Sequence, residues 1–125
     1  MPRTVLIADD TREVVELISI YLETERRGYR VVRAYDGAQC LEAIKRERPD
    51  VVLLDLMMPE MSGKEVLDQL RGDEYKPPTI IISARQTSDG EFGAYTQVKA
   101  VFRKPMDADK LLKAIDLIAE AGSVQ

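Results

Sequence analysis

Short apolar runs alternate along the chain with longer stretches in which apolar and polar residues mix. The clearest run is 51–54, four aliphatic residues that end abruptly at Asp55. Such a run is too short for a helix and fits a strand buried on both faces of a parallel sheet. Arginines flank the run at 29–34, which places that strand near an edge. The predicted strands are residues 5–8, 29–34, 51–54, 79–82 and 98–103.

The stretches between the strands carry apolar residues at helical spacing, which predicts amphipathic helices. Thr11 and Asp107 precede two of these stretches and are predicted to cap the helices that follow. Gly63 is predicted to open another helix, and Asp36-Gly37 is predicted to form a turn. The predicted apolar faces comprise residues 14, 17, 18, 21 and 22; 38, 40, 41 and 44; 66, 67 and 70; and 111, 112, 115, 118 and 119.

Glycine and proline mark the predicted helix ends. Gly28 ends the first helical region after the polar stretch 23–27, Pro49 ends the second, and Gly72 closes the third.

The region from 85 to 99 has the weakest pattern of the chain. Gly90 and Gly93 fall where a helix is expected, and each costs about 1 kcal/mol there relative to alanine. We therefore predict a fourth helix that is short or irregular.

Five strands that alternate with helical segments predict an α/β domain, because right-handed crossovers then build a parallel sheet covered on both faces. The strand order does not follow from this argument alone. The 125 residues suffice for one ordinary domain. We expect a single domain over residues 1–125, with no effector domain in this chain.

The net charge and the amino-acid composition exclude several classes of function. The net charge of −4 and the sequence pI of about 4.9 argue against nonspecific binding to nucleic acid or to an anionic membrane. The absence of histidine excludes histidine metal sites and histidine-based catalytic triads. Cys40 is the only cysteine, so no intrachain disulfide forms. No signal peptide or transmembrane-length run is present, which predicts a cytoplasmic protein.

Polar side chains stand at the ends of four predicted strands: Asp9, Asp10, Asp55, Ser83 and Lys104. The carboxyl ends of parallel strands share one rim, where open α/β sheets bind ligands. If the first and third strands are neighbours, the three carboxylates converge on this rim. Their mutual repulsion needs compensation, and a hard divalent cation such as Mg²⁺ takes oxygen ligands and favours phosphate co-ligands.

These groups suffice to receive and hold a phosphoryl group. A carboxylate can act as the nucleophile in phosphoryl transfer, and the metal neutralises charge on the transferring group. Lys104 supplies a cation for one phosphoryl oxygen, and Ser83 offers a hydroxyl donor to another.

The same residues carry a family resemblance that covers nearly the whole chain. The sequence resembles the receiver domain of two-component response regulators, the CheY-like superfamily. The matching residues are Asp9-Asp10, the stretch 49–63, Ser83-Ala84 and Lys104-Pro105, with Asp36-Gly37 as a lesser match. Each feature alone is weak evidence, but all four in order at domain-compatible spacing form a strong signal.

The resemblance implies a flavodoxin-like, doubly wound, five-stranded parallel sheet of order 2-1-3-4-5. It implies that Asp55 is phosphorylated by a histidine kinase or a histidine phosphotransfer protein, which switches interactions with a downstream protein target. Such a domain is a signalling domain that catalyses only its own phosphorylation and slow dephosphorylation.

The resemblance also implies the roles of the other site residues. Asp10, Asp55 and the backbone carbonyl of Met57 would bind Mg²⁺ (or Mn²⁺), with Asp9 contributing through a water molecule. Ser83 would be the switch hydroxyl, and Lys104 would contact the phosphoryl group.

The predicted fifth strand departs from the family pattern. Val101 stands where the family usually has an aromatic residue, and Phe102 points to the opposite face because side chains alternate along a strand. The other departures are Gln97-Val98 in place of Gly-Ala, and Lys99-Ala100 in place of an acidic pair. We therefore expect a monomer or weak dimer that does not form the dimer that many DNA-binding relatives form through this surface. From the net charge we also expect no direct contact with nucleic acid.

Three alternative functions compete with that of a phosphorylatable receiver. A receiver-fold binding module that acts without phosphorylation stays open, and Mg²⁺ titration would discriminate it. A flavin carrier needs a glycine- and hydroxyl-rich phosphate loop where this chain has Asp9-Asp10-Thr11. An aspartate-nucleophile phosphatase typically carries an acid two residues after the nucleophile, where Met57 stands here.

Overall fold

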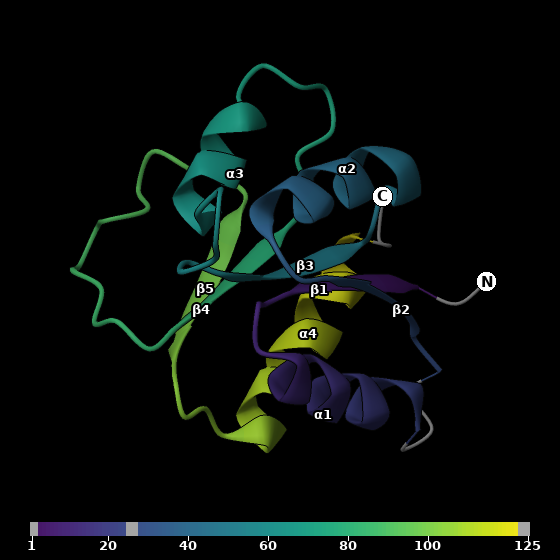
Figure 1. Ribbon diagram of the computed structural model, residues 1–125. Helices are drawn as coiled ribbons and strands as arrows, with labels where there is room; N and C mark the ends of the chain where they lie inside the picture. Colours follow the sequence, from purple (N-terminus) through teal and green to yellow (C-terminus); the bar gives the residue numbers. More distant parts are fainter. Residues whose placement is uncertain (1–2, 25–27, 123–125) are drawn as a thin grey trace.

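The computed structural model describes residues 3–24 and 28–122. Its centre is a parallel sheet with the strand order β2-β1-β3-β4-β5 (Figure 1). The strands are β1 Thr4–Ala8, β2 Arg30–Ala34, β3 Val51–Asp55, β4 Thr79–Ser83 and β5 Val98–Arg103. The helices over the described residues are α1 Arg12–Glu23, α2 Gly37–Glu47, α3 Gly63–Gln69 and α4 Ala108–Gly122. The expected fold class and strand order are confirmed, and β2 lies at an edge as predicted.

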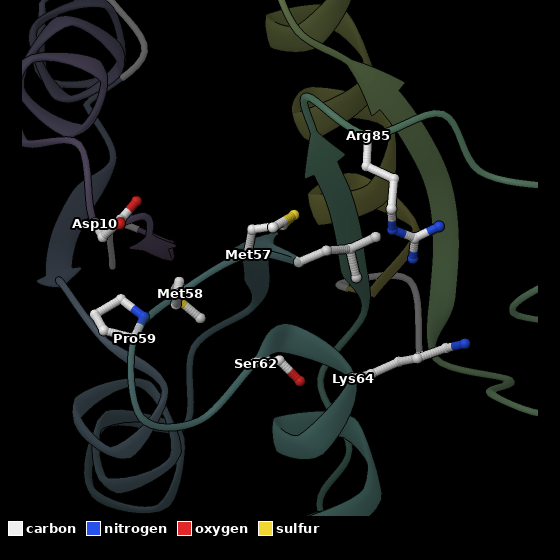
Figure 2. Close-up of a pocket in the computed structure, with 8 residues that line it drawn as sticks. Asp10, Met57, Met58, Pro59, Ser62, Lys64 and Arg85 are labelled. Carbon is white, nitrogen blue, oxygen red and sulfur yellow. The ribbon is translucent and has the colours of Figure 1, made fainter.

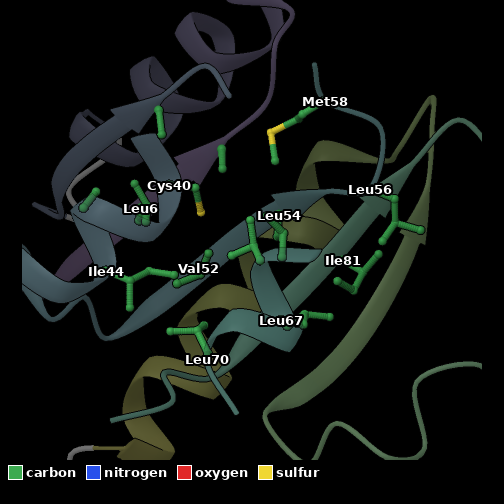
Figure 3. Packing of buried hydrophobic residues seen from close by; sticks show 14 of the residues in the cluster. Leu6, Cys40, Ile44, Val52, Leu54, Leu56, Met58, Leu67, Leu70 and Ile81 are labelled. Atoms are coloured by element: carbon green, nitrogen blue, oxygen red, sulfur yellow. The ribbon is translucent and has the colours of Figure 1, made fainter. Parts of the chain in front are cut away.

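Two hydrophobic clusters sandwich the sheet. Helices α2 and α3 cover one face and helices α1 and α4 cover the other (Figure 1). Side chains of successive strand residues alternate between the clusters, so that Leu54 packs beneath α2 and α3 while Leu53 packs against α1 and α4. Figure 3 shows the first cluster, in which Leu67 and Leu70 approach Val52 and Leu54. Every residue of β3 and β4 is buried, which explains their uninterrupted apolar sequences.

Helix starts agree with the predicted positions but not always with the predicted contacts. Asp107 and Ser62 accept backbone N–H groups of α4 and α3, and Ser62 forms a capping box with Glu65. Thr11 occupies the N-cap position of α1 as predicted. Its side chain makes no capping hydrogen bond, so the predicted side-chain cap is wrong. Asp36 accepts the Gln39 N–H at 2.8 Å.

The predicted Asp36-Gly37 turn is therefore a helix cap followed by the first residue of α2. Gly37 has no room for a side chain, because an added Cβ would lie 2.1 Å from the Met61 carbonyl oxygen. Helix α1 ends at Glu23, whereas residues 25–27 of the predicted polar stretch lie outside the described residues.

The chain from 84 to 97 crosses from β4 to β5 through bends and turns (Figure 1). The weak helix expected there is replaced by turns that pack beside α3. Phe92 is 8% exposed and belongs to the cluster under α2 and α3, and Tyr95 packs against it. Strand β5 consequently has an open outer face, where Val101 is 43% exposed, while Phe102 packs on the α1 and α4 side as its alternation predicts.

Candidate functional site

The polar residues predicted at the strand ends meet at the carboxyl end of the sheet. The parallel register of β1 with β3 places Ala8 beside Leu54, so that Asp9 and Asp55 follow on neighbouring strands. Carboxylate oxygens of Asp9, Asp10 and Asp55 lie within 4.8 Å of one another. The assumed contact between the first and third strands is thus correct.

Asp9 is completely buried and has two different oxygen environments. Its Oδ1 accepts the Thr11 N–H at 2.9 Å, which orients the carboxylate at the start of α1. Its Oδ2 lies 2.7 Å from Lys104 Nζ as an ion pair. Within the described part of the chain, this oxygen is the buried side-chain atom that lacks a well-aligned hydrogen bond. A buried carboxylate oxygen in this state is suited to a further cationic or water partner.

Asp55 ends the central strand and is 3% exposed. The Met57 N–H donates to its Oδ1 at 3.2 Å, and Lys104 Nζ donates to its Oδ2 at 3.3 Å. Burial raises the pKa of Asp55, and the negative charge of Asp9 raises it further. The Met57 N–H and Lys104 lower this pKa, but the net shift is upward. Gly63 makes this geometry possible, because an added Cβ would lie 2.5 Å from the Asp55 carbonyl oxygen.

Lys104 bridges Asp9 and Asp55 with one ammonium group. Burial lowers the pKa of Lys104, but the close contact with Asp9 Oδ2 and the charges of both carboxylates outweigh this effect, so that the pKa is raised overall. The lysine side chain is therefore a cation held directly at the carboxylates.

Ser83 lies at the end of β4 and is completely buried. Its Oγ accepts the Arg85 N–H at 3.0 Å, and its carbonyl oxygen accepts the Lys104 N–H at 2.8 Å. The hydroxyl thus connects the rim of the sheet to the segment that follows β4.

A cavity of about 560 Å³ opens beside Asp10 (Figure 2). Asp10 lies on one side of it and Arg85 on the other, with Met57 between them (Figure 2). Lys64 from the first turn of α3 lines the same wall as Arg85. Arg85 and Lys64 were not predicted as site residues. Arg85 had one usable signal, its place two residues after the strand-end Ser83, whereas Lys64 reaches the cavity only because α3 folds against the rim.

The carboxylate cluster fits a divalent cation. All three side chains offer oxygen, Asp10 is exposed to solvent, and Asp9 Oδ2 is incompletely satisfied. Hard cations of the Mg²⁺ type prefer such oxygen donors and retain several waters.

A sheet of this order with an acidic pocket at its carboxyl end defines a CheY-like receiver fold. A model of the response regulator receiver domain family matches residues 5–116. The chain therefore belongs to the response regulator receiver domain family. Receiver domains of response regulators are signalling domains of two-component systems; histidine kinases phosphorylate them, and they bind Mg²⁺ at an acidic pocket.

Individual relatives agree with the family match. The chain is 42% identical over 85 residues to the response regulator GtcR of Aneurinibacillus migulanus, covering 68% of this chain and 34% of that protein. It is 37% identical over 92 residues to the alkaline phosphatase synthesis transcriptional regulatory protein PhoP of Bacillus subtilis strain 168, covering 74% and 36%. The chain thus spans about a third of the length of these curated relatives.

A solved structure shows the same fold. The receiver domain of the Francisella response regulator 1452 superposes with a TM-score of 0.84 at 27% identity, covering 95% of this chain and 98% of that one. In the part of the chain that the structure describes, no helix has the length and apolar composition needed to cross a lipid bilayer.

Proposed function

We propose that this domain receives a phosphoryl group on Asp55 from a phosphohistidine of a histidine kinase or a histidine phosphotransfer protein, with Mg²⁺ or Mn²⁺ as the cofactor. The observation that carries the proposal is the convergence of Asp9, Asp10 and Asp55 within 4.8 Å beside the ammonium group of Lys104. The phosphorylated state then changes which proteins the domain binds.

The transfer step uses the Asp55 carboxylate as the nucleophile. A carboxylate oxygen forms a bond to phosphorus while the phosphorus–nitrogen bond breaks, and the electron pair leaves with the histidine nitrogen, which takes up a proton. Met57 N–H and Lys104 hold the two oxygens of Asp55 in fixed directions before the reaction. Lys104 then pairs with a phosphoryl oxygen, and Ser83 donates its hydroxyl to another.

Asp10, Asp55 and the Met57 carbonyl oxygen would hold the cation, and Asp9 would act through a water molecule. The bound cation neutralises negative charge on the transferring group. The incompletely satisfied Asp9 Oδ2 and the exposed Asp10 support this assignment. Lys104 remains the permanent counter-charge at the buried side of the cluster.

The output of the domain is proposed to be a protein contact. The net charge of −4 supports action without direct nucleic-acid binding by this domain, as a monomer or weak dimer. The curated relative PhoP is by name a transcriptional regulatory protein, so the downstream partner of the whole protein is a separate question from the chemistry of this domain.

Phosphorylation by a small phosphodonor, followed by intact mass measurement, tests the proposal. The wild-type protein should gain one phosphoryl group only when Mg²⁺ is present, and Asp55→Asn should gain none. Asp50→Asn is a matched control, because Asp50 also flanks β3 but contacts the Thr4 N–H at the opposite end of the sheet. Full labelling of Asp55→Asn at another residue would overturn the assignment. Absence of any Mg²⁺ response would favour a binding module that acts without phosphorylation.

A further inference from the structure

Glu91 forms an ion-pair cluster with two cations, Arg85 and Lys64, which line the cavity beside Asp10 and Met57. Its Oε2 lies 2.6 Å from Arg85 Nη2 and 3.3 Å from Lys64 Nζ. Its Oε1 accepts the Ser88 N–H at 3.1 Å and lies 3.3 Å from Arg85 Nη1, so the guanidinium is held in a two-pronged contact. The Glu91 side chain is 11% exposed, which is low for a carboxylate on a connecting segment.

The two cations belong to the cavity as well as to Glu91. Arg85 and Lys64 both line the cavity that Asp10 and Met57 line from the other side (Figure 2). One carboxylate facing two cations leaves a net positive charge on this wall. Phosphorylation would replace the single negative charge of the Asp55 carboxylate with a phosphoryl group that carries about one and a half to two negative charges near them.

Glu91 is firmly ionised. Hydrogen bonding to Arg85 and to the Ser88 N–H lowers the pKa of Glu91 to about 2, with Lys64 adding in the same direction. The carboxylate therefore stays a counter-ion for Arg85 and Lys64 across the physiological pH range.

The cluster fastens the β4–β5 segment to α3. Phe92 follows Glu91 directly and is buried, with Lys64 Nζ 5.7 Å from the centre of its ring. Further along, the Tyr95 hydroxyl donates to Asp68 Oδ1 at 2.6 Å, and Arg71 lies over the Tyr95 ring. Among these contacts between the segment and α3, the ion pair of Glu91 with Lys64 involves a residue that lines the cavity.

Arg85 has a second connection to the site. Its backbone N–H donates to Ser83 Oγ at 3.0 Å, while its side chain holds Glu91. If the Ser83 hydroxyl turns to a phosphoryl oxygen, the backbone of Arg85 loses this partner. Arg85 therefore has two contacts, one through its backbone and one through its guanidinium, that phosphorylation of Asp55 could change.

We propose that Glu91 is an internal counter-ion that the phosphoryl group on Asp55 displaces. In the unphosphorylated domain, Glu91 holds Arg85 and Lys64 and thereby keeps segment 86–97 against α3. After phosphorylation, Arg85 turns to the phosphoryl oxygens, Glu91 is released, and the segment opens and exposes Phe92 to a protein partner. This inference deepens the proposed function and rests on phosphorylation of Asp55.

Hydrogen exchange of segment 86–97, read together with intact mass, tests the proposal. In the unphosphorylated protein, Glu91→Gln keeps an oxygen for the Ser88 N–H but loses the charge, so exchange should be several-fold faster than in wild type. Asp89→Asn, which removes the same charge from an exposed position of the same segment, should leave exchange unchanged. Phosphorylation should accelerate exchange in wild type and add little in Glu91→Gln.

The outcomes separate the two proposals. Phosphorylated wild type with unchanged exchange, or Glu91→Gln with wild-type exchange, would overturn the displacement of Glu91 while leaving phosphorylation of Asp55 intact. Failure of the wild-type protein to gain a phosphoryl group would overturn the proposed function and, with it, the displacement.

Discussion

Lys104 Nζ and Asp9 Oδ2 lie 2.7 Å apart, although Asp9 has no exposed surface. A buried carboxylate is stable only with a counter-charge, because removal from water strongly disfavours an unpaired ion. The same ammonium group also reaches Asp55, so it offsets part of the negative charge of the three carboxylates before any cation binds.

Replacing Lys104 should therefore destabilise the domain. Lys104→Met leaves two buried carboxylates without their ammonium partner, and we expect the free energy of unfolding to fall by about 1–3 kcal/mol. Urea unfolding in the absence of divalent cations measures the change. Lys113→Met, which removes a lysine from an exposed position of α4, is the matched control. Equal stability of the two variants would show that the ion pairs at the rim contribute nothing.

Asp10→Asn should weaken Mg²⁺ binding while the fold persists, because Asp10 is exposed and its proposed role is to contact the cation. A ligand present at 100 times its Kd stabilises a protein by about 2.7 kcal/mol. The rise in Tm on Mg²⁺ addition should therefore be large for wild type and small for Asp10→Asn. Asp109→Asn, which removes an exposed carboxylate on α4, is the control and should show the same rise as wild type. A full Tm rise in Asp10→Asn would exclude Asp10 as a ligand.

Ser83→Ala should affect the phosphorylated domain more than the free domain. The variant leaves the Arg85 N–H without its partner, which costs roughly 1 kcal/mol, but removes no proposed cation ligand. We expect near-normal Mg²⁺ affinity together with a reduced conformational change on phosphorylation. Ser83→Thr retains the hydroxyl and should restore the response. If Ser83→Ala responds fully, the hydroxyl is not the switch.

Cys40 should make the domain less stable at high pH. Burial, with a further contribution from Asp36, raises the pKa of the thiol from 9.0 to about 12. Between these values only the unfolded chain releases the thiol proton, so the free energy of unfolding falls as pH rises through this window. At pH 10 the loss attributable to Cys40 should be about 1–2 kcal/mol. Comparing the pH dependence of urea unfolding in wild type and Cys40→Ala isolates this contribution; identical slopes would contradict it.

The strands were predictable because β3 and β4 are buried on both faces, and only uninterrupted apolar sequence satisfies that environment. The convergence of Asp9, Asp10 and Asp55 was predictable because parallel strands bring their carboxyl ends to one rim. Helix faces were less certain: Leu17 has helical spacing with its apolar neighbours, yet it is 55% exposed at the border of the buried stripe.

The cluster around Glu91 could not have been predicted in the same way. Its members come from α3, from the end of β4 and from a segment of turns, and ion pairs between such elements follow no sequence period. The glycines at 90 and 93 correctly indicated a poor helix. The aromatic residues Phe92 and Tyr95 indicated some packing in this region, but not that turns in place of a helix would bury Phe92 against the core.

The close backbone contacts of Gly37 and Gly63 make the loop between β3 and α3 intolerant of change. A single added carbon at either position would meet backbone atoms, the Met61 carbonyl in one case and the Asp55 carbonyl in the other. Gly90, in contrast, has open space around it, and asparagine tolerates its left-handed φ of 77°. In a library of variants, selection should retain glycine at 37 and 63 and admit substitutions at 90. The backbone of the loop that carries Met57 therefore constrains the sequence at two positions outside it, one in α2 and one at the start of α3.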